Sequence, residues 1–555
     1  MKKLSLILGA LILVMQARAQ TGGAGPAEEG HHGMNIIFFL VDDMGWSDLG
    51  CYGSTFYKTP QIDHFAREGV RFTQAYGASH VCSPSRGAFI TGQYPARTHL
   101  TDWLKGRRNY PFQKLLNAAV VQHLPYGKPT LPELLRENGY ATAIFGKWHL
   151  GDDSASTERQ GFDVHIPQWN EGWPNGTYFA PYHMKGLEGG PSGEYLTDRL
   201  TTEALKWVDQ HKGHPFFLFL SHFAVHDPIE GPPHLVEKYM HKLQHGSKPE
   251  QGAPYILEQN PDQDKVFTRK ELNEMLSDKQ YSGYRVLPDR IVKVKQFQDN
   301  PEYAAMVESV DESLGRVLAK LKEDGLAENT IVIFASDNGG MSAANFYKPE
   351  RNIPLSMLNK AYSTSNLPLR GGKGWLYEGG IRVPTIIYWP GNGQHGIVSD
   401  VPIMNIDFYP TLLAMVGIKP PKGYPLDGMS IVPLLTGDKQ GTDAVVRRPL
   451  YWHFPQYSNH GAQSPGGAIR LGDYKLLEYF EQDKVQLFDI RTDPGEQHDL
   501  SAAQPGRVKQ MQDMLHAWRN RIHANMPSRN PHYIQTLGDQ WQDWHPAPAK
   551  PKNKE

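Results

Sequence analysis

The sequence predicts an α/β fold, because short apolar runs alternate with amphipathic segments along most of the chain. The runs are rich in β-branched and aromatic residues, which is typical of strands buried in a sheet. Between them, 194–211 and 301–324 carry apolar residues at helical spacing. Polar residues follow several of the runs directly, and open α/β sheets place their sites at the carboxyl ends of strands. The clearest predicted strands are 35–41, 140–145, 215–220 and 330–335.

The pattern changes after about residue 433, where short predicted strands follow one another without long helices between them. These strands are 450–454, 468–471, 474–479 and 485–490, and a helix is expected over 506–522. We therefore expect a main domain over 33–433, a C-terminal subdomain over 434–525 and a tail over 526–555.

The start of the chain predicts export. Lys2 and Lys3 precede a short apolar run over 4–15, and Ala17-Arg18-Ala19 has the small-residue pattern of a cleavage site. We expect a signal peptide over 1–19 and a periplasmic or secreted mature protein. The apolar run is too short for a membrane span, and no later segment is long and apolar enough for one.

Composition excludes several partners. The 555 residues carry a net charge of −2, and 21% of them are charged. Such a small net charge gives no reason to expect binding to nucleic acid or to an anionic membrane surface. The two cysteines are Cys51 and Cys82. In an exported protein, two cysteines suggest a disulfide.

Acidic residues stand at the ends of two predicted core strands. Asp42 and Asp43 follow the strand over 35–41, and Asp337 and Asn338 follow the strand over 330–335. Buried carboxylates are costly unless something pairs with them, and a divalent cation is a natural partner. Two solvated acids at a loop start are the simpler alternative. A set of oxygen donors without Cys or His favours calcium or magnesium over zinc.

The run V-C-S-P-S-R-G-A-F-I-T-G, from Val81 to Gly92, predicts a nucleophile at the start of a helix. Pro84 suits the first helical position, because its missing N–H is not needed there. The helix N-terminus would then face Cys82 with unpaired N–H groups, which favour anions. Arg86 offers a planar fork that suits a tetrahedral oxyanion.

Three further segments carry basic residues near predicted strand ends. G-K-W-H-L-G follows the strand over 140–145, and an extended chain would place Lys147 and His149 on the same side. His226 comes shortly after the strand over 215–220. Lys373 lies in G-G-K-G, whose glycines let the backbone approach a ligand closely. Taken singly, each of these segments would more often be structural.

Together these motifs resemble the sulfatase family. Residues 82–92 match its signature C-x-P-S-R-x-x-x-[LI]-T-G, and G-K-W-H-L-G, S-D-N-G and L-F-D-I are similar to further family motifs. The resemblance implies an alkaline-phosphatase-like fold, with a large, mostly parallel sheet and a smaller α+β C-terminal subdomain built on a small antiparallel sheet. It also implies that a maturation enzyme oxidises Cys82 to formylglycine, the nucleophile, which leaves Cys51 free.

The resemblance also assigns roles. Arg86, Lys147, Lys373 and the metal would stabilise the sulfate oxygens, with His226 as general acid and His149 acting on the second hydroxyl of the hydrated aldehyde. The metal ligands would be Asp42, Asp43, Asp337 and Asn338, and the metal calcium or magnesium. The family often has Pro and Thr around the histidine at 226, whereas this chain has Val225 and Asp227, a departure that would change the pKa of His226.

The expected substrate is a sulfated glycan. Export favours a polysaccharide or oligosaccharide, and an aromatic-rich segment over 152–192 offers rings that could stack on sugars or pack in the core. The run 99–103 resembles bacterial carbohydrate sulfatases and enzymes acting on galactose or N-acetylgalactosamine sulfates. The polar segment 246–300 is expected to be an insertion near the substrate entrance. The aromatic residues are Trp169, Trp173, Tyr178 and Tyr182.

Three alternatives remain open on the sequence. One is a phosphatase or phosphonate hydrolase of the same superfamily, which often has Thr or Ser at the nucleophile position. Another is a protein that binds sulfated glycans without cleaving them. The third is a hydrolase that uses the unmodified thiol of Cys82, which the paired acidic motifs disfavour.

Overall fold

A nine-stranded sheet forms the centre of the molecule. The computed structural model describes residues 33–151, 156–245, 252–263, 265–345 and 352–537, so the expected signal peptide over 1–19 lies outside the described residues. The strand order is β12 (Ile397–Ser399), β2 (Val70–Tyr76), β11 (Arg382–Tyr388), β10 (Thr330–Ser336), β1 (Asn35–Val41), β6 (Phe216–Ser221), β4 (Ala141–Gly146) and β5 (Val164–Ile166), with β13 (Ile403–Met404) also paired to β2.

The sheet is mostly parallel. β1 pairs in parallel with β10 on one side and with β6 on the other, and β4 is parallel to β6 and β5. Only β11 runs against its neighbours, β10 and β2. Register aligns Val41 with Ser336 and Leu40 with Ser221, so β1, β10 and β6 end at the same edge. The predicted α/β class, with a mostly parallel sheet, is confirmed.

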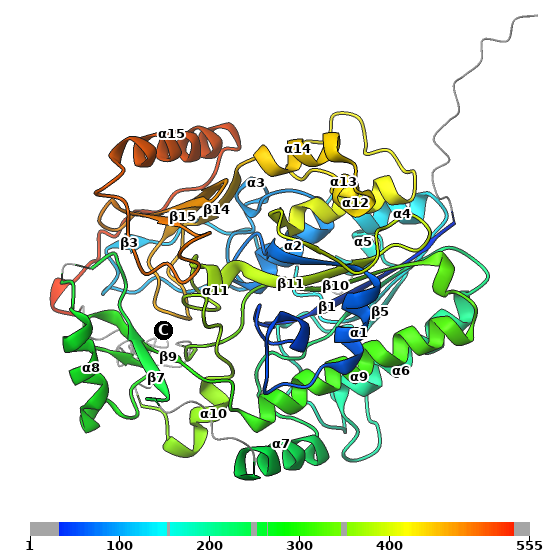
Figure 1. Cartoon of the computed structure of the whole chain (residues 1–555), viewed down its shortest axis with the longest axis horizontal. Coiled ribbons are helices and arrows are strands. Elements are labelled where there is room, and N and C mark those ends of the chain that lie inside the picture. Colours follow the sequence, from blue (N-terminus) through cyan, green and yellow to red (C-terminus); the bar gives the residue numbers. More distant parts are fainter. Residues whose placement is uncertain (1–32, 152–155, 246–251, 264, 346–351, 538–555) are drawn as a thin grey trace, which may run out of the picture.

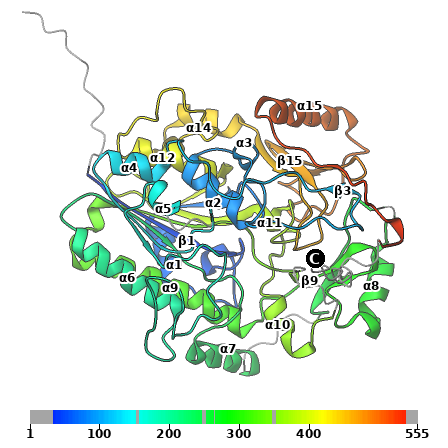
Figure 2. The same ribbon diagram turned by 180° about the vertical axis from the view of Figure 1, so that it is seen from behind.

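Helices cover both faces of this sheet (Figures 1 and 2). One face carries α1 (Pro60–Glu68), α6 (Leu196–His211), α7 (Pro233–His245) and α9 (Pro301–Glu323). The other carries α2 (Cys82–Thr91), α4 (Leu131–Glu137), α12 (Phe408–Met415), α13 (Val432–Thr436) and α14 (Lys439–Arg447). Alternate residues of β1 belong to the two apolar cores on either side of the sheet. A strand buried on both faces needs apolar side chains at every position, which explains its continuous apolar run.

The longest helix, α9, shows why the sequence forms helices where it does. Asn300 caps it, because its side chain accepts the N–H groups of Glu302 and Tyr303. Pro301 occupies the first helical position, where a missing N–H costs nothing. Four further α-helices are only four residues long: α3 (Pro95–Thr98), α5 (Ser156–Arg159), α10 (Leu358–Ala361) and α11 (Glu378–Ile381).

The C-terminal part forms a separate four-stranded antiparallel sheet, in the order β14 (Leu450–Phe454), β15 (Gly466–Leu471), β16 (Tyr474–Tyr479) and β17 (Lys484–Asp489). α15 (Pro505–Arg521) packs on β15 and β16. Residues of α13 and α14 still belong to the core of the main sheet. The change of sequence pattern near residue 433 therefore precedes the second sheet, and the division at 433/434 stays a prediction. Beyond it, β18 (Ser528–Arg529) pairs with β3 (Leu115–Leu116).

The segment after α7 builds a small unit of its own against the C-terminal part. Its three strands are, in sheet order, β7 (Tyr255–Glu258), β9 (Ile291–Lys295) and β8 (Val286–Leu287). The helix α8 (Arg269–Ser277) lies between β7 and β8 in the sequence. Asp262 Oδ2 accepts hydrogen bonds from the Ser464 hydroxyl at 3.0 Å and from the Glu481 backbone N–H at 2.9 Å. The described part of the insertion is thus held to the C-terminal subdomain.

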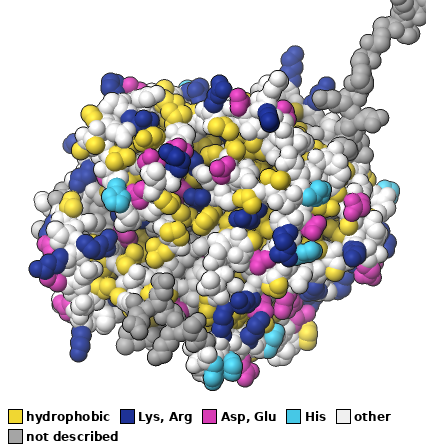
Figure 3. Space-filling model, in the orientation of Figure 1, with side chains coloured by type: hydrophobic (Ala, Val, Ile, Leu, Met, Phe, Trp, Pro, Cys, Tyr) yellow, Lys and Arg dark blue, Asp and Glu magenta, His cyan; other side chains and the backbone are white. Residues whose placement is uncertain are grey.

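On the face that Figure 3 shows, positive and negative side chains are mixed and neither charge sign dominates. Lys and Arg side chains lie among acidic ones there, and apolar side chains form patches between them. Among the described residues, no helix has both the length and the apolar character that a membrane crossing needs.

Candidate active site

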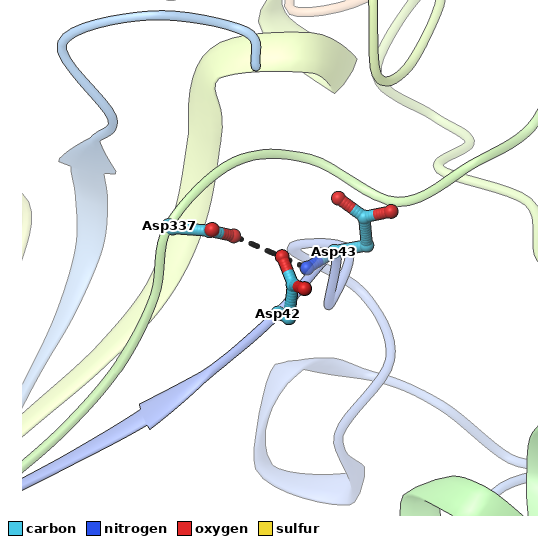
Figure 4. A group of neighbouring side chains, drawn as sticks. All are labelled: Asp42, Asp43 and Asp337. Atoms are coloured by element: carbon cyan, nitrogen blue, oxygen red, sulfur yellow. Dashed lines mark hydrogen bonds between the residues drawn. The ribbon is translucent and has the colours of Figure 1, made fainter. Parts of the chain in front are cut away.

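Three carboxylates meet at the carboxyl edge of the central sheet (Figure 4). Asp42 and Asp43 follow β1, and Asp337 follows β10, whose last residue is in register with the last residue of β1. One carboxylate oxygen from each lies within 4.8 Å of those of the other two. The Asp43 N–H donates to Asp337 Oδ1 at 3.1 Å, and Asn338 Nδ2 donates to Asp43 Oδ1 at 2.8 Å. The structure therefore brings together all four predicted metal ligands.

The donor set fits a hard divalent cation. Asp42 Oδ1 and Asn338 Oδ1 are buried and have no hydrogen-bond partner among the described residues. Buried acceptors of this kind are costly unless a ligand or ion satisfies them. Carboxylate and amide oxygens, without sulfur or imidazole in the set, are what Ca²⁺ and Mg²⁺ prefer.

Two lysines lie on the carboxylates. Lys147 Nζ is 2.5 Å from Asp42 Oδ2, and Lys373 Nζ is 2.7 Å from Asp43 Oδ2. Burial raises the pKa of the Asp42 carboxyl, but the nearby positive charges, chiefly Lys147, lower it below its usual value. Burial lowers the pKa of Lys373, but Asp43 raises it well above the ordinary range. Lys373 can thus present positive charge to an anion at this site.

Arg86 joins α2 to the same cluster. Its Nε lies 2.9 Å from Asp337 Oδ2 and its Nη2 lies 3.4 Å from Asp42 Oδ1. The Ser85 hydroxyl also donates to the backbone carbonyl of Asp337 at 2.6 Å. These contacts fix the first turn of α2 against the end of β10.

The helix itself starts earlier than predicted. α2 begins at Cys82, with Val81 as its N-cap, so Pro84 is the third helical residue and not the first. Proline is tolerated there because the first four N–H groups of a helix have no intrahelical acceptor. Cys82 consequently lies in the first turn instead of in front of it.

The Cys82 thiol is a poor nucleophile as it stands. It is buried, and burial raises its pKa above the usual thiol value although Lys147 and Lys373 oppose the change. A thiol protonated at neutral pH lacks the reactive thiolate form. Cys51 has a pKa raised to about 12, mainly by burial, and both cysteines are free. The expectation of a free Cys51 is confirmed.

His149 adopts a backbone conformation that the sequence did not indicate. The extended conformation expected for its segment is wrong at His149, whose φ is 58°. Its Nε2 donates to the Leu104 carbonyl at 2.9 Å, since a carbonyl oxygen can only accept. Burial holds its pKa well below the ordinary value, so the ring is neutral. The remaining nitrogen, Nδ1, is a buried acceptor with no partner among the described residues.

His226 is bracketed by two carboxylates. Its Nδ1 lies 2.7 Å from Asp227 Oδ1, and its Nε2 lies 3.7 Å from Asp43 Oδ2. Burial and Lys373 lower the pKa of His226, but Asp227 and Asp43 raise it more, so the net shift is upward. Asp227, where the chain departs from the family pattern, therefore contacts the histidine directly.

The aromatic segment after His149 divides between core and surface. Tyr178 and Tyr182 are buried in the main core, which corrects the idea that they could stack on a sugar. Trp169 is partly buried against the same core, and Trp173 is 40% exposed. The backbone of Gly172 lies against the His149 ring, where an added Cβ would be 2.6 Å from Cε1. Most of the aromatic rings that the sequence suggested for sugar binding therefore pack against the apolar core instead.

Two buried histidines beside Lys373 were not expected from the sequence. The Gly374 N–H donates to the His80 carbonyl at 3.1 Å, and a Cβ on Gly374 would lie 2.5 Å from the Cβ of His460. His80 stands two residues before Cys82, but a single histidine gives no pattern. His460 lies in an irregular segment between β14 and β15, where no periodicity indicates it.

Comparisons with known proteins agree with this geometry. The sulfatase family model matches residues 34–418, and the model of the C-terminal region of N-sulphoglucosamine sulphohydrolase matches residues 372–524. The chain is 25% identical to an N-acetylglucosamine-6-O-sulfatase of Bacteroides thetaiotaomicron, over 93% of this chain and 92% of that protein. It is 30% identical to the human N-acetylgalactosamine-6-sulfatase, over 76% of this chain and 68% of that protein.

A solved structure shares the fold of this chain. The protein Ps i-CgsB, in complex with k-i-k-neocarrahexaose, is 26% identical to this chain and superimposes with a TM-score of 0.62 over 92% of this chain and 97% of the other. The matched family model covers more than half of the sequence, including every residue of the carboxylate cluster. The chain therefore belongs to the sulfatase family and is a sulfuric ester hydrolase.

Proposed function

We propose that this enzyme removes O-sulfate groups from a sulfated glycan, with formylglycine at position 82 as nucleophile and a divalent cation, preferably calcium, at the carboxylate cluster. The observation that carries the proposal is the position of Cys82. It opens a helix whose first turn is fixed to Asp337 by Ser85 and Arg86, beside two lysines. The proposed nucleophile therefore lies next to the side chains that we propose to bind the sulfate.

The nucleophile requires a chemical change at Cys82. A maturation enzyme would oxidise Cβ by two electrons with an external oxidant; the C–S bond breaks, the sulfur leaves as sulfide, and an oxygen atom takes its place as the carbonyl. The hydrated aldehyde would supply a hydroxyl that attacks the sulfur of the ester while the bond from sulfur to the sugar oxygen breaks. The buried, protonated thiol supports the proposal, because it leaves the unmodified side chain with little nucleophilic power.

The basic residues would bind the sulfate. Arg86, Lys147 and Lys373 lie around the carboxylates, so an anion there would contact fixed positive groups without reorganising them. Asp42, Asp43, Asp337 and Asn338 would hold the cation. When bound, the cation would supply further positive charge to the sulfate oxygens.

The two histidines would handle protons. His226 has a raised pKa and can therefore carry a proton near neutral pH, as a general acid for the leaving sugar oxygen must. His149 is neutral, and its unpaired Nδ1 can accept a proton. It would take the proton of the second hydroxyl of the hydrate, so that the aldehyde re-forms as sulfate leaves.

The substrate class rests on the relatives. Two of them are named for 6-sulfated N-acetylglucosamine and N-acetylgalactosamine, and a third was solved with a neocarrahexaose. We propose a sulfated polysaccharide or oligosaccharide, with galactose or N-acetylgalactosamine sulfate as the first candidates.

The test combines mass spectrometry with a substrate panel. We expect the active fraction to carry formylglycine in the peptide that contains residue 82, and Cys82→Ala to remain folded but inactive. Sulfated mono- and oligosaccharides, 4-nitrophenyl sulfate and 4-nitrophenyl phosphate would be compared at equal concentration. Full activity with an intact thiol would contradict the formylglycine proposal. Faster turnover of the phosphate ester than of every sulfate would favour the phosphatase alternative.

A further inference from the structure

His460 lies beside the lysine that is placed to bind sulfate, although it comes from the C-terminal subdomain. Its backbone and Cβ pack on Gly374, where an added Cβ would meet the His460 carbonyl at 2.4 Å. Gly374 has φ of +94°, which glycine adopts without strain, so the chain can pass this closely. Gly374 follows Lys373 directly, and the His460 ring is close enough to Lys373 for its charge to lower the pKa of the imidazole.

The His460 ring carries a polar atom with nothing to bind. The residue is 6% exposed, and its Nε2 is buried without a hydrogen-bond partner among the described residues. Asn338 Oδ1 and His149 Nδ1, on two other residues of the candidate site, are also buried without a hydrogen-bond partner among the described residues. Unpaired buried polar atoms are rare in native proteins, and groups of them mark places where a ligand completes the bonding.

The charge state of His460 indicates what kind of group it can bind. Burial holds its pKa well below the ordinary value, and Lys373 contributes in the same direction. A neutral imidazole is one hydrogen-bond donor and one acceptor, which suits an alcohol, whereas an anion would be better served by a charged side chain. The neighbouring Lys373 already provides such a charge.

The loop that carries His460 is held from three sides. Asn260 Nδ2 donates to the Ala462 carbonyl at 2.8 Å, which ties the loop to the insertion after α7. Gln463 Oε1 accepts the Leu376 N–H at 2.7 Å, close to the lysine segment. Arg107 donates to the side-chain oxygen of Asn459, next to His460. A loop fixed in this way can hold a side chain in a defined place for recognition.

We propose that His460 is a specificity-determining residue that hydrogen-bonds a hydroxyl of the sulfated sugar, the one nearest the ester. The inference rests on the proposed function and names the part of the chain that recognises the sugar. It assigns this task to the C-terminal subdomain, whereas the residues that bind the sulfate come from the main domain and from the Lys373 segment.

The experiment compares His460→Ala with His460→Gln on three substrates. These are 4-nitrophenyl sulfate, the faster of N-acetylgalactosamine 6-sulfate and N-acetylglucosamine 6-sulfate, and the 4-deoxy analogue of that sugar, which lacks the nearest hydroxyl. For His460→Ala we expect kcat/KM on the sugar sulfate to fall about 10- to 100-fold, the loss of one buried hydrogen bond, mainly through KM. His460→Gln should recover part of the loss, because its amide can donate and accept. 4-Nitrophenyl sulfate should change little.

The deoxy substrate separates recognition from structure. Wild-type enzyme should handle it about as poorly as His460→Ala handles the parent sugar, and the variant should lose nothing more on it. His453→Gln is the matched control: this buried histidine of β14 donates from Nε2 to the Asn525 carbonyl at 2.7 Å, so its loss should affect stability without any preference between substrates.

Several results would overturn the proposal. Equal losses on the aryl and sugar sulfates would make His460 a structural residue, and unchanged kinetics on all three substrates would remove it from the site. If His460→Ala lost as much activity on the 4-deoxy sugar as on the parent sugar, the imidazole and the 4-hydroxyl would not be in contact. If wild-type enzyme cleaved no sulfate ester at all, the proposed function would fail, a result distinct from each of these.

Discussion

The ammonium of Lys147 lies 2.5 Å from Asp42 Oδ2, and neither side chain is exposed to solvent. The contact joins the residue after β4 to the residue after β1, across the strand β6 that separates them in the sheet. This lysine is the largest of the positive charges that offset the buried Asp42 carboxylate, and Arg86 is the next. The first prediction follows from that relationship.

We expect Lys147→Met to make the fold dependent on calcium. Removing one partner of a buried ion pair typically costs about 3–5 kcal/mol, because the other charge stays buried. A cation at the cluster would compensate Asp42, so the free energy of unfolding should fall strongly in a chelator and recover when calcium is added. Urea unfolding under both conditions measures this.

Lys475→Met provides the control for that experiment. Lys475 is equally buried, and its Nζ lies 3.0 Å from Glu378 and 2.9 Å from Glu496, apart from the carboxylate cluster. Its loss should destabilise the protein by a similar amount with or without calcium. If calcium rescued both variants equally, or neither, the cluster would not be the cation site.

His226→Ala should damage the hydrolysis of sugar sulfates far more than that of 4-nitrophenyl sulfate. An alkoxide leaving from a sugar is strongly basic and needs a proton in the transition state, whereas nitrophenolate leaves readily. General acid catalysis contributes typically about 10²–10⁴-fold, which sets the expected difference in kcat. Comparable losses on both substrates would assign His226 to sulfate binding, with His149 the next candidate for the acid.

Asp227→Asn should move the alkaline limb of the pH–rate profile to lower pH. Burial and Lys373 lower the pKa of His226, while Asp227, 2.7 Å away, raises it. Removing the carboxylate therefore lowers this pKa, so the proton is lost earlier as the pH rises and an acid function fails sooner. The measurement is kcat against pH for a sugar sulfate. A profile identical to the wild type would mean that Asp227 does not tune the acid.

Gly172→Ala should reduce turnover by displacing His149. The added methyl would lie 2.6 Å from Cε1 of that ring, which is itself anchored through Nε2 to the Leu104 carbonyl. Small misplacements of a catalytic group can cost about 10²-fold in rate. Gly213→Ala, which has open space around its Cβ position, is the matched control and should retain activity. Normal kinetics in Gly172→Ala would show that His149 tolerates the shift or takes no part in the reaction.

The sequence by itself determined the fold class and the identity of the residues at the sheet edge. Apolar runs buried on both faces indicate parallel strands, and parallel strands end at one edge, so polar residues that follow them must meet. Asp42 and Asp337 are 295 positions apart, and their places at strand ends together with the family motif S-D-N-G paired them. The cysteine motif then resembles one family closely enough to name its chemistry.

Local patterns could not locate every part of the site, because tertiary packing decides it. The start of α2 at Cys82, the burial of Tyr178 and the turn at His149 depend on what packs against each segment. His460 is the clearest case. It lies in an irregular loop of a second sheet, and only the docking of that sheet, together with a glycine that permits close approach, brings its backbone against Gly374, the residue after Lys373.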